Sequence, residues 1–560
     1  MKLSGKELIL RLLERQGVTR IAGIPGGANL PLYDALTASP IRHTLARHEQ
    51  GAGFIAQGMA RASGRPAVCF ATSGPGATNL LTAIADAKLD SVPIVAITGQ
   101  VPRAMIGTDA FQEIDTYGLT LPITKHNFLV RSAGELLEVI PAAFRIAASG
   151  RPGPVVVDVP KDVQNEALEF DAWPAPGEPA TAPTVAPDQI EELARMINEA
   201  RRPLLYIGGG VIISDASGIL RRIAAKASLP TVSTLMGLGA MPADAPLFLG
   251  MLGMHAARYT NLALEECDLL IAAGVRFDDR ATGKVAQFCP QAAIIHVDID
   301  ESELGKVKTP RLGIVGDVGA VLRSAEPRLR EDGRPEWLAR VAELKALHPL
   351  DLPGAEDPLQ PYGLVLQTAA LLDDEAIVTT DVGQHQMWVA QAYPLRRPRQ
   401  FLTSGGLGTM GFGLPAALGA AMAQPERTVV CFTGDGSLLM NIQELATAAE
   451  EDLNVKVIVF NNAHLGLVRQ QQALFYGGRM SAVRFHAEPD FVAIAKGFGV
   501  EGCDLGQVSD PLEALARALA EPGPRLINVP IGHEENVFPM VPPGAANRDM
   551  IGGEHHVHTR

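Results

Sequence analysis

The 560-residue chain has few cysteines, few aromatic residues and fewer basic than acidic residues, and these shortages exclude several classes of protein. Its five cysteines (Cys69, Cys267, Cys289, Cys431 and Cys503) are widely spread and include no CxxC pair. This pattern argues against a disulfide framework or a zinc site and indicates buried thiols in a reducing compartment. The net charge of -14, from 48 basic and 62 acidic side chains, argues against nucleic acid or an anionic membrane as a partner.

Long apolar runs are also missing, since none reaches the roughly 18 residues needed to span a bilayer. The first 17 residues, MKLSGKELILRLLERQG, alternate charged and apolar residues at helical spacing and lack the apolar core of a signal peptide. We therefore expect a cytoplasmic protein with no membrane partner. A hydrophobic content of 47% in a chain of this length is ample for several buried cores.

Two stretches rich in Pro and Ala divide the chain into three blocks of domain size. They are DAWPAPGEPATAPTVAP (171–187) and HPLDLPGAEDPLQP (348–361), and neither has helical periodicity. We predict domains over 1–168, 188–335 and 362–540, linkers over 169–187 and 348–361, and a C-terminal tail over 541–560. The histidines near the end of that tail could bind a metal adventitiously, but we expect a mobile terminus.

Each block alternates short β-branched runs with helix-like segments. The runs include PAVCFAT, PLLYIGG and VKVIVFNN, and their apolar character is continuous rather than alternating. Such strands, separated by helices, are typical of parallel sheets covered on both faces. The predicted fold class is α/β, with three doubly wound parallel-sheet domains.

The richest stretch for chemistry is FTGDGSLLMNIQELATAAEEDLNVKVIVFNN, residues 432–462. It predicts a strand ending in a glycine turn, one helix over LLMNIQELATAAEED, and a second strand ending in two asparagines. In a right-handed βαβ unit the two strands end at the same edge, so Asp435 and Asn462 should be neighbours. Their oxygens would suit Mg²⁺, and the Gly434–Ser437 backbone would suit a diphosphate. A tight turn with an Asp cap, followed by an Asn-Asn turn, explains these residues equally well.

The spacing from GDG to NN resembles the signature of thiamine diphosphate enzymes, and further segments resemble the catalytic subunit of acetohydroxyacid (acetolactate) synthase. The similarity covers essentially the whole chain and is greatest to the bacterial isozyme I type, through VRQQQALFY and VFPMVPPGAANRDMIG. It implies pyrimidine-binding, FAD-binding and diphosphate/Mg-binding domains in that order. The segments that carry it include IPGGANLPLYDAL, ARHEQGAGFIAQGMARASG, TSGPGATNLLTAIADA, GTDAFQEID, RPGPVVVDVPKDV, GVRFDDRATGK, HVDID and GGLGTMGFGLPAALGA.

The resemblance implies a thiamine diphosphate site in which Glu49 hydrogen-bonds the aminopyrimidine ring and Met410 props the cofactor in its bent form. Without the family, Glu49 would be read as a surface residue and Met410 as a gap filler. TSGPGATN is not a dinucleotide motif, because Asn79 stands where the last glycine belongs. The other residues that the resemblance implies at this cofactor are Gly27, Pro75, Asn79, Val382, Gly383, Gln384, His385, Gly408, Gly434, Asp435, Gly436, Ser437, Asn462, His464 and Gly466, with Asp435, Asn462 and His464 at the metal.

Five residues are implied in catalysis: Glu49, Gln112, Lys161, Arg276 and Gln471. Gln112 and Lys161 would line the substrate channel, although such residues near turns are usually only solvated. Arg276 would bind the second substrate's carboxylate, and the alternative is an ion pair with the two following aspartates. Many family members carry Trp where Gln471 stands, so we expect only a weak preference for 2-oxobutanoate over pyruvate.

Glycine-rich and polar segments in the central block are all predicted at strand ends, where a doubly wound sheet binds ligands. Each of them alone could be an ordinary βα turn. The resemblance implies that together they bind FAD, with Arg151 reaching in from the first domain. The predicted FAD residues are Arg151, Gly208, Gly209, Gly210, Thr234, Leu235, Met236, Gly253, Met254, His255, Gly274, Arg276, Asp278, Arg280, Asp298, Ile299, Gly316, Asp317 and Val318.

The implied activity decarboxylates pyruvate and joins the hydroxyethyl carbanion to a second 2-oxo acid, which begins branched-chain amino acid synthesis. The flavin would be structural, since carboligation has no net redox change. A homodimer or homotetramer with sites between chains is implied, and family members often recruit a small regulatory subunit. The alternatives are a pyruvate oxidase, a catabolic acetolactate synthase, a glyoxylate carboligase and a regulator that has lost catalysis. Glu49 argues against the glyoxylate carboligase, which typically lacks this glutamate.

Overall fold

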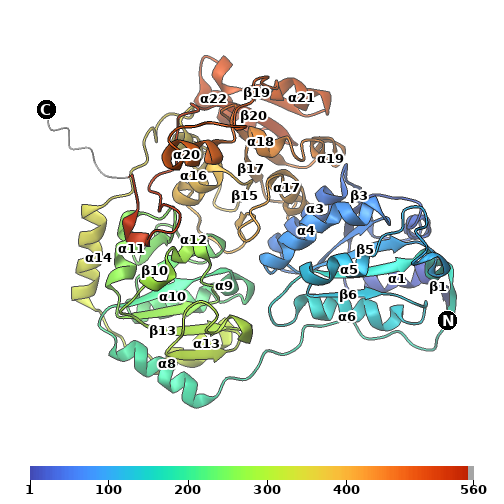
Figure 1. Ribbon diagram of the computed structural model, residues 1–560, viewed down its shortest axis with the longest axis horizontal. Coiled ribbons are helices and arrows are strands. Elements are labelled where there is room, and N and C mark those ends of the chain that lie inside the picture. The colour runs from blue at the N-terminus through green and yellow to red at the C-terminus, as the bar shows by residue number, and fades with distance from the viewer. Residues whose placement is uncertain (553–560) are drawn as a thin grey trace.

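The computed structural model describes residues 1–552 and folds them into three units, each built on a six-stranded parallel sheet (Figure 1). The predicted α/β class with three doubly wound parallel sheets is confirmed. No helix within residues 1–552 is both long enough and apolar enough to cross a bilayer. The histidines of the predicted tail lie in 553–560, outside the described residues.

The first unit has strand order β3-β2-β4-β5-β7-β6 and a small antiparallel pair, β1 with β8. Its strands are β1 (Lys2–Ser4), β2 (Arg20–Gly23), β3 (Arg42–Leu45), β4 (Ala67–Ala71), β5 (Ile94–Gln100), β6 (His126–Leu129), β7 (Val155–Pro160) and β8 (Ala167–Glu169). Its helices are α1 (Gly5–Arg15), α2 (Leu30–Leu36), α3 (Glu49–Ser63), α4 (Pro75–Leu89), α5 (Thr116–Thr120), α6 (Leu136–Ala148) and α7 (Lys161–Asn165).

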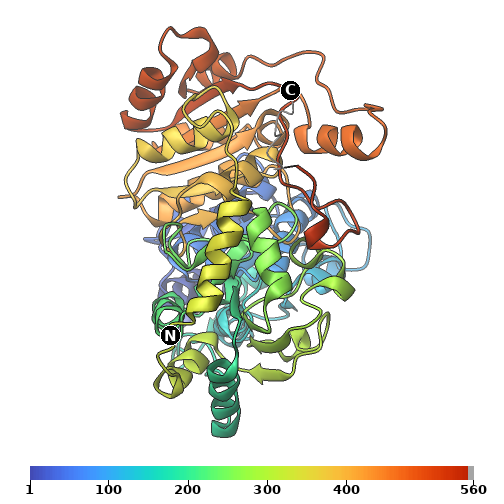
Figure 2. The same cartoon turned by 90° about the vertical axis from the view of Figure 1, so that its left-hand side faces the viewer.

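The central unit has strand order β11-β10-β9-β12-β13-β14, and its helix α14 lies beside α11 (Figure 2). Its strands are β9 (Pro203–Ile207), β10 (Thr231–Ser233), β11 (Phe248–Met251), β12 (Leu269–Ala273), β13 (Ala293–Asp298) and β14 (Leu312–Val315). Its helices are α8 (Pro187–Glu199), α9 (Gly209–Ile213), α10 (Ser217–Lys226), α11 (Arg258–Glu266), α12 (Asp279–Thr282), α13 (Val318–Ala325) and α14 (Pro335–Leu347).

The third unit has strand order β16-β15-β17-β18-β20-β19. Its strands are β15 (Ile377–Thr380), β16 (Phe401–Leu402), β17 (Val429–Gly434), β18 (Val455–Asn461), β19 (Glu501–Asp504) and β20 (Arg525–Pro530). Its helices are α15 (Pro361–Ala370), α16 (Gln384–Ala392), α17 (Gly413–Ala423), α18 (Asp435–Leu438), α19 (Glu444–Glu450), α20 (Gly466–Phe475), α21 (Phe491–Gly497) and α22 (Pro511–Ala520).

The single helix expected between the GDG turn and the next strand is wrong in detail, because the structure divides it into α18 and α19 with a turn between them. Asn441 lies in this turn, and its side-chain amide donates to the carbonyl of Gly411 at 2.7 Å. The bond links the turn to the segment that precedes α17. The two strands flanking the segment are formed as predicted.

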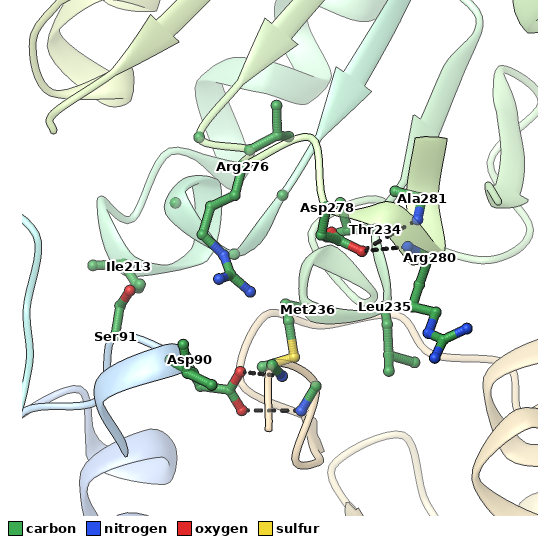
Figure 3. A pocket seen from close by; sticks show the side chains of 18 of the residues that line it. Asp90, Ser91, Ile213, Thr234, Leu235, Met236, Arg276, Asp278, Arg280 and Ala281 are labelled. Atoms are coloured by element: carbon green, nitrogen blue, oxygen red, sulfur yellow. Dashed lines mark hydrogen bonds between the residues drawn. The ribbon is translucent and has the colours of Figure 1, made fainter. Parts of the chain in front are cut away.

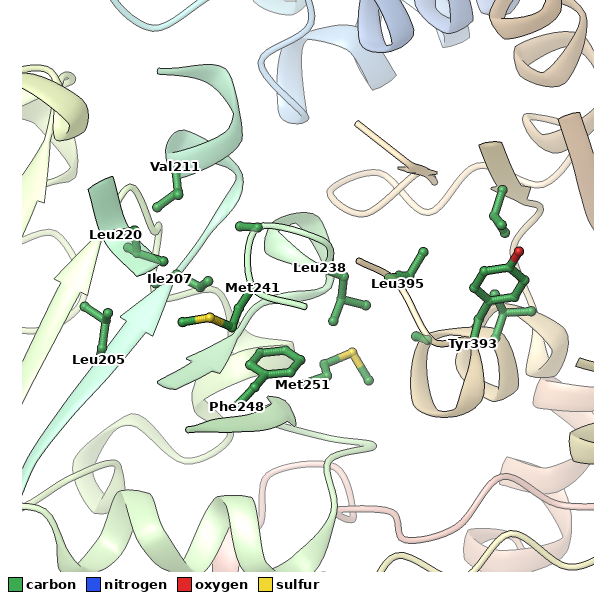
Figure 4. Close-up of a cluster of buried hydrophobic side chains, with 14 of the residues drawn as sticks. Leu205, Ile207, Val211, Leu220, Leu238, Met241, Phe248, Met251, Tyr393 and Leu395 are labelled. Atoms are coloured by element: carbon green, nitrogen blue, oxygen red, sulfur yellow. The ribbon is translucent and has the colours of Figure 1, made fainter. Parts of the chain in front are cut away.

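Close helix packing joins the first and third units. Helix α3 crosses α17 where glycines remove the side chains between them: a Cβ on Gly58 would lie 2.1 Å from the Ala416 carbonyl oxygen, and one on Gly419 would lie 2.0 Å from that of Ile55. The core of the central unit likewise continues into the third, where Tyr393 and Leu395 join it (Figure 4). The third unit therefore packs against both the first unit and the central unit.

Candidate active site

Asp435 and the Asn461–Asn462 pair lie side by side at the end of two neighbouring strands. Strands β17 and β18 are parallel, and Gly434 pairs with Phe460 in register. Asp435 is 3% exposed, and its Oδ1 accepts a 2.7 Å hydrogen bond from the Gly436 N–H. Its Oδ2 is buried and accepts no hydrogen bond from the described residues. A buried carboxylate oxygen without a partner is the kind of group that a cation would satisfy.

The Asp435 carboxylate makes this edge of the sheet favourable for a cation. Burial raises the pKa of Asp435 to about 6, and main-chain N–H groups of Gly436 and residues 462–464 oppose that rise. The Oδ1 of Asn462 accepts from the His464 N–H at 3.0 Å, which orients its carboxamide. Within residues 1–552 no group of three or more His, Cys, Asp and Glu side chains could hold a metal. A metal here would therefore rely on one carboxylate, the Asn462 carboxamide, main chain and the ligand's own oxygens.

The segment after β15 faces the same turn. The Ser437 hydroxyl donates to the Val382 carbonyl at 2.9 Å, so the GDGS turn and the Val382–His385 segment are in contact. His385 is buried and its Nε2 has no partner among the described residues, while burial lowers its pKa to about 3 and keeps the ring neutral. A Cβ on Gly466 would lie 2.0 Å from the Gln384 Oε1, so a larger residue there would displace the Gln384 side chain.

Asp381 is a buried carboxylate that was not among the predicted site residues, and it directly follows β15. Its Oδ1 accepts from the Val382 and Gly411 N–H groups at 2.9 and 2.8 Å, and its Oδ2 accepts from Gly413 at 3.1 Å. Burial raises its pKa to about 6. The carboxylate ties the segment bearing Met410 to the end of β15.

The first unit gathers its predicted site residues at the carboxyl edge of its own sheet. Glu49 opens α3, is 9% exposed, and its Oε2 accepts from the Asn79 side-chain amide at 2.9 Å. Gln112 packs on the TSGPG loop, since a Cβ on Gly74 would lie 2.9 Å from its carbonyl oxygen. Gly27 has open space above it, and Pro75 and Lys161 begin α4 and α7 at the same edge.

A cavity of about 820 Å³ opens at the carboxyl edge of the central sheet (Figure 3). Residues from all three units line it, and Figure 3 shows the Arg276 guanidinium directed into it. Gly253 and Gly316 do not line it: a Cβ on Gly253 would meet the Arg280 carbonyl at 2.3 Å, and one on Gly316 would meet Val185 at 2.6 Å. The predicted FAD residues that do line it are Arg151, Gly208, Gly209, Gly210, Thr234, Leu235, Met236, Met254, His255, Gly274, Arg276, Asp278, Arg280, Asp298, Ile299, Asp317 and Val318.

The glycines of this cavity allow two strand ends to approach each other. A Cβ on Gly210 would lie 2.6 Å from the Gly274 Cα, and Gly274 itself has φ +61°. These glycines therefore permit a tight approach of two strand ends, and their binding of FAD remains a prediction. Asp278 caps α12 through the N–H groups of Arg280 and Ala281, whereas Arg276 forms no ion pair within residues 1–552. The expected alternative of a salt-bridged Arg276 is thus not observed.

Arg151 reaches from the first unit to the central unit, as predicted. Its guanidinium donates to Glu303 at 2.7 Å, to Asp300 at 3.3 Å and to the Ser91 hydroxyl at 2.9 Å. Val382, Gly408 and Gln471, which were predicted for thiamine diphosphate or substrate, line the cavity as well. Lining residues that sequence reasoning missed include Asp90, Ser91, Gln386 and 404–407. The polar pair Asp90–Ser91 between a helix and a strand was the available signal.

Models of thiamine pyrophosphate enzymes match the chain in three places: the N-terminal TPP binding domain over 3–119, the central domain over 190–325 and the C-terminal TPP binding domain over 381–529. The acetolactate synthase isozyme 1 large subunit of Escherichia coli (strain K12) is 60% identical over 552 residues, 98% of each chain. The isozyme 2 large subunit of the same strain is 47% identical over 551 residues, 98% of this chain and 99% of that one. Acetolactate synthase 1, chloroplastic, of Nicotiana tabacum is 46% identical over 567 residues, 98% and 84% of the two chains.

Proposed function

Because the chain belongs to the acetolactate synthase large subunits, which are thiamine diphosphate enzymes of the carboligase kind, we propose the following reaction and division of labour. The enzyme decarboxylates pyruvate and joins the remaining two-carbon unit to a second pyruvate, giving 2-acetolactate, or to 2-oxobutanoate, giving 2-aceto-2-hydroxybutanoate. This is the first common step of isoleucine and valine biosynthesis. The observation that carries the proposal is the buried, unpartnered Oδ2 of Asp435 beside Asn462.

Asp435, Asn462 and His464 would hold Mg²⁺, and His464 would contribute through its main chain, because its Nδ1 already bonds the Asn462 carbonyl at 2.7 Å. Val382–His385 and Gly434–Ser437 would bind the diphosphate, with Gly408 and Gly466 leaving room beside it. When bound, thiamine diphosphate supplies the carbanion chemistry of the reaction. The chain's task is to bind it, orient it and exclude water.

Glu49 would exchange a proton with the pyrimidine ring. Asn79 donates to its Oε2 and so orients the carboxyl, while Oε1 is left for the ligand. Gly27 and Pro75 would border the ring, and Met410 would support the cofactor from the third unit. Gln112, which packs on the loop that precedes Pro75, has a φ of +59°, a conformation that residues other than glycine rarely adopt.

Gln112 and Lys161 would line the approach of substrate, Arg276 would bind the carboxylate of the second 2-oxo acid, and Gln471 would contact its alkyl end. Arg276 suits this role because its guanidinium faces the cavity without a carboxylate partner in the described chain. FAD would occupy the cavity of about 820 Å³ as a structural cofactor. Its volume lies within the range of cofactor pockets, and glycines, polar groups and apolar side chains all line it.

We place the enzyme in the cytoplasm as a homodimer or larger homo-oligomer whose sites combine Glu49 of one chain with Asp435 of another. Apolar side chains are exposed close to Gln112, among them Phe111 at 85% and Leu121 at 61%, and a second chain would cover them. The large-subunit names of the relatives support a small regulatory subunit as a further partner. The domain limits 1–168, 188–335 and 362–540 are part of the same proposal, and residues 541–552 pack on the central unit.

The proposal is tested with purified protein, supplied with pyruvate, thiamine diphosphate, Mg²⁺ and FAD in turn. We expect a yellow protein that forms acetolactate only with thiamine diphosphate and Mg²⁺, and that consumes neither oxygen nor a quinone. Glu49→Gln should lower turnover by about 10² to 10⁴-fold. Equal activity in the two proteins would refute the proton role of Glu49, and oxygen-dependent turnover would favour a pyruvate oxidase.

A further inference from the structure

The segment Thr403–Met410, here called the glycine loop, connects β16 to α17 and borders two predicted cofactor sites. Ser404, Gly405, Gly406, Leu407 and Gly408 line the cavity of about 820 Å³. The last residue of the loop is Met410, which we propose to support thiamine diphosphate. One short loop therefore connects the flavin side of the molecule with the thiamine side.

Asp90 of the first unit binds the main chain of this loop. Its Oδ1 accepts from the Gly406 N–H at 2.7 Å, and its Oδ2 accepts from the Gly405 N–H at 3.0 Å (Figure 3). The Asp90 side chain is fully buried, and it directly follows α4. Two N–H groups of a loop in the third unit are thus satisfied by one carboxylate of the first unit.

Asp86 binds the side chains of the same loop one turn earlier in α4. Its Oδ2 accepts from the Ser404 and Thr409 hydroxyls, the latter at 2.9 Å. The Ser404 Oγ in turn accepts from the Thr409 N–H at 2.8 Å, which closes the loop on itself. Asp86 is completely buried. The Asp86 carboxylate has therefore lost its contact with water, and the hydrogen bonds that compensate for this loss require the loop to stay in place.

Arg61 of α3 supplies the opposing charge. Its guanidinium donates to Asp90 at 2.8 Å, lies 3.5 Å from Asp86, and donates to the Thr403 carbonyl at 3.0 Å. It also lies over the Phe412 ring, 5.1 Å from the centroid. One guanidinium faces two carboxylates, so the cluster keeps an excess negative charge. Burial, and then the charge of Asp90, raises the pKa of Asp86 to about 6.

The central unit also contacts the loop, through Met236, and the first unit adds a contact through Leu89. A Cβ on Gly405 would lie 2.3 Å from the Met236 Sδ, and one on Gly406 would lie 2.8 Å from the Leu89 Cβ. Met236 lines the flavin cavity, and Leu89 precedes Asp90. The loop is therefore confined between two units, and a change at the cavity wall is passed to its main chain.

We propose that Asp86 and Asp90 are positioning residues that hold the glycine loop in one conformation and thereby couple flavin binding in the cavity to thiamine diphosphate binding beside Met410. The coupling between the two cofactors rests on the proposed function. That Asp86 and Asp90 hold the loop rests only on the contacts described above. Coupling through one shared loop is reciprocal, so each cofactor should raise the affinity for the other by the same factor.

The experiment uses the full chain with Asp90→Asn, which preserves volume but turns one acceptor oxygen into a donor that faces donors. Thr409→Val is a milder variant that removes one of the hydroxyl groups that donate to Asp86. The matched control is Asp158→Asn, since Asp158 is also buried in the first unit, and among residues 1–552 its side chain bonds only Thr98 and Gln100. Hydrogen exchange over 403–412 is measured without cofactors, and thiamine diphosphate is titrated with and without FAD by calorimetry.

We expect FAD to tighten thiamine diphosphate binding about fivefold or more in the unaltered chain, with the ratio falling toward one in Asp90→Asn and partway in Thr409→Val. Exchange of 403–412 should be faster in both variants and unchanged in Asp158→Asn. A ratio of one in the unaltered chain, or a full ratio in Asp90→Asn, would overturn the coupling. Unchanged exchange in Asp90→Asn would overturn the holding of the loop, whereas missing acetolactate formation would count only against the proposed reaction.

Discussion

The cavity of the central unit and the residues predicted at thiamine diphosphate differ in how far a single chain brings their parts together. Arg151, Thr234 and Gly408 come from three units and line one cavity of about 820 Å³. Glu49 and Asp435 lie at the edges of two different sheets, and neither lines that cavity. No hydrogen bond or ion pair within residues 1–552 joins them. One chain is thus enough to assemble the cavity, whereas a second chain at the thiamine diphosphate residues remains a prediction.

The largest effect is expected at Asp435. Asp435→Asn removes the charge that would hold Mg²⁺ and should lower turnover by about 10³-fold, since metal charge stabilisation is worth several kcal/mol. Turnover is measured against Mg²⁺ concentration. Asp504→Asn is the matched control, because Asp504 also ends a strand of this sheet and accepts from the N–H two residues on, at 2.8 Å. Similar losses in both variants would refute a specific metal role.

A mixed dimer tests the comparison directly. One chain carries Glu49→Gln, the other carries Asp435→Asn, and the two chains bear different tags for purification of the mixed species. If each site combines Glu49 of one chain with Asp435 of its partner, one of the two sites is intact and about half the activity returns. Sites formed within single chains would leave both sites damaged, and the mixed dimer would be as inactive as its parents.

Arg276→Lys should give a smaller loss. Lysine keeps the charge but loses the planar, two-pronged geometry, so kcat/KM for the second 2-oxo acid should fall by about 10 to 100-fold. Flavin content is measured alongside, because Arg276 also lines the cavity. Arg222→Lys is the control, since Arg222 is exposed, pairs with Glu326 at 2.9 Å and does not line the cavity. A loss of flavin with unchanged kcat/KM would assign Arg276 to the cofactor alone.

The smallest effect concerns acceptor choice. The unaltered enzyme should favour 2-oxobutanoate over pyruvate by less than about tenfold, and Gln471→Trp should raise that ratio about fourfold, the value of one buried CH₂. Products are counted after the two acids compete. Gln472→Trp is the control, because Gln472 bonds Ser481 and does not line the cavity. An equal rise in both variants would show that Gln471 does not contact the acceptor.

Much of the fold could be predicted because parallel strands buried on both faces are continuously apolar, and each of the three sheets contains such runs. The adjacency of Asp435 and Asn462 followed from the handedness of one βαβ unit. The division of the intervening helix into α18 and α19 was not predicted, and the turn between them includes a bond from Asn441 to Gly411, 30 residues away. Asp381 was missed because two of its three main-chain partners, Gly411 and Gly413, lie 30 and 32 residues further along the chain.

The sequence by itself determined the strand–helix alternation and the parallel class of each sheet, because these depend on local periodicity. It also determined the motifs at strand ends, because the tight turns there require glycine. Only the tertiary structure decided which strand ends share a cavity, that Gly253 and Gly316 pack closely against Arg280 and Val185, and that Asp90 reaches Gly405, 315 residues further along the chain. Contacts at that separation depend on how sheets and helices pack against one another. No local pattern records them, since a buried carboxylate looks the same in the sequence whichever loop it binds.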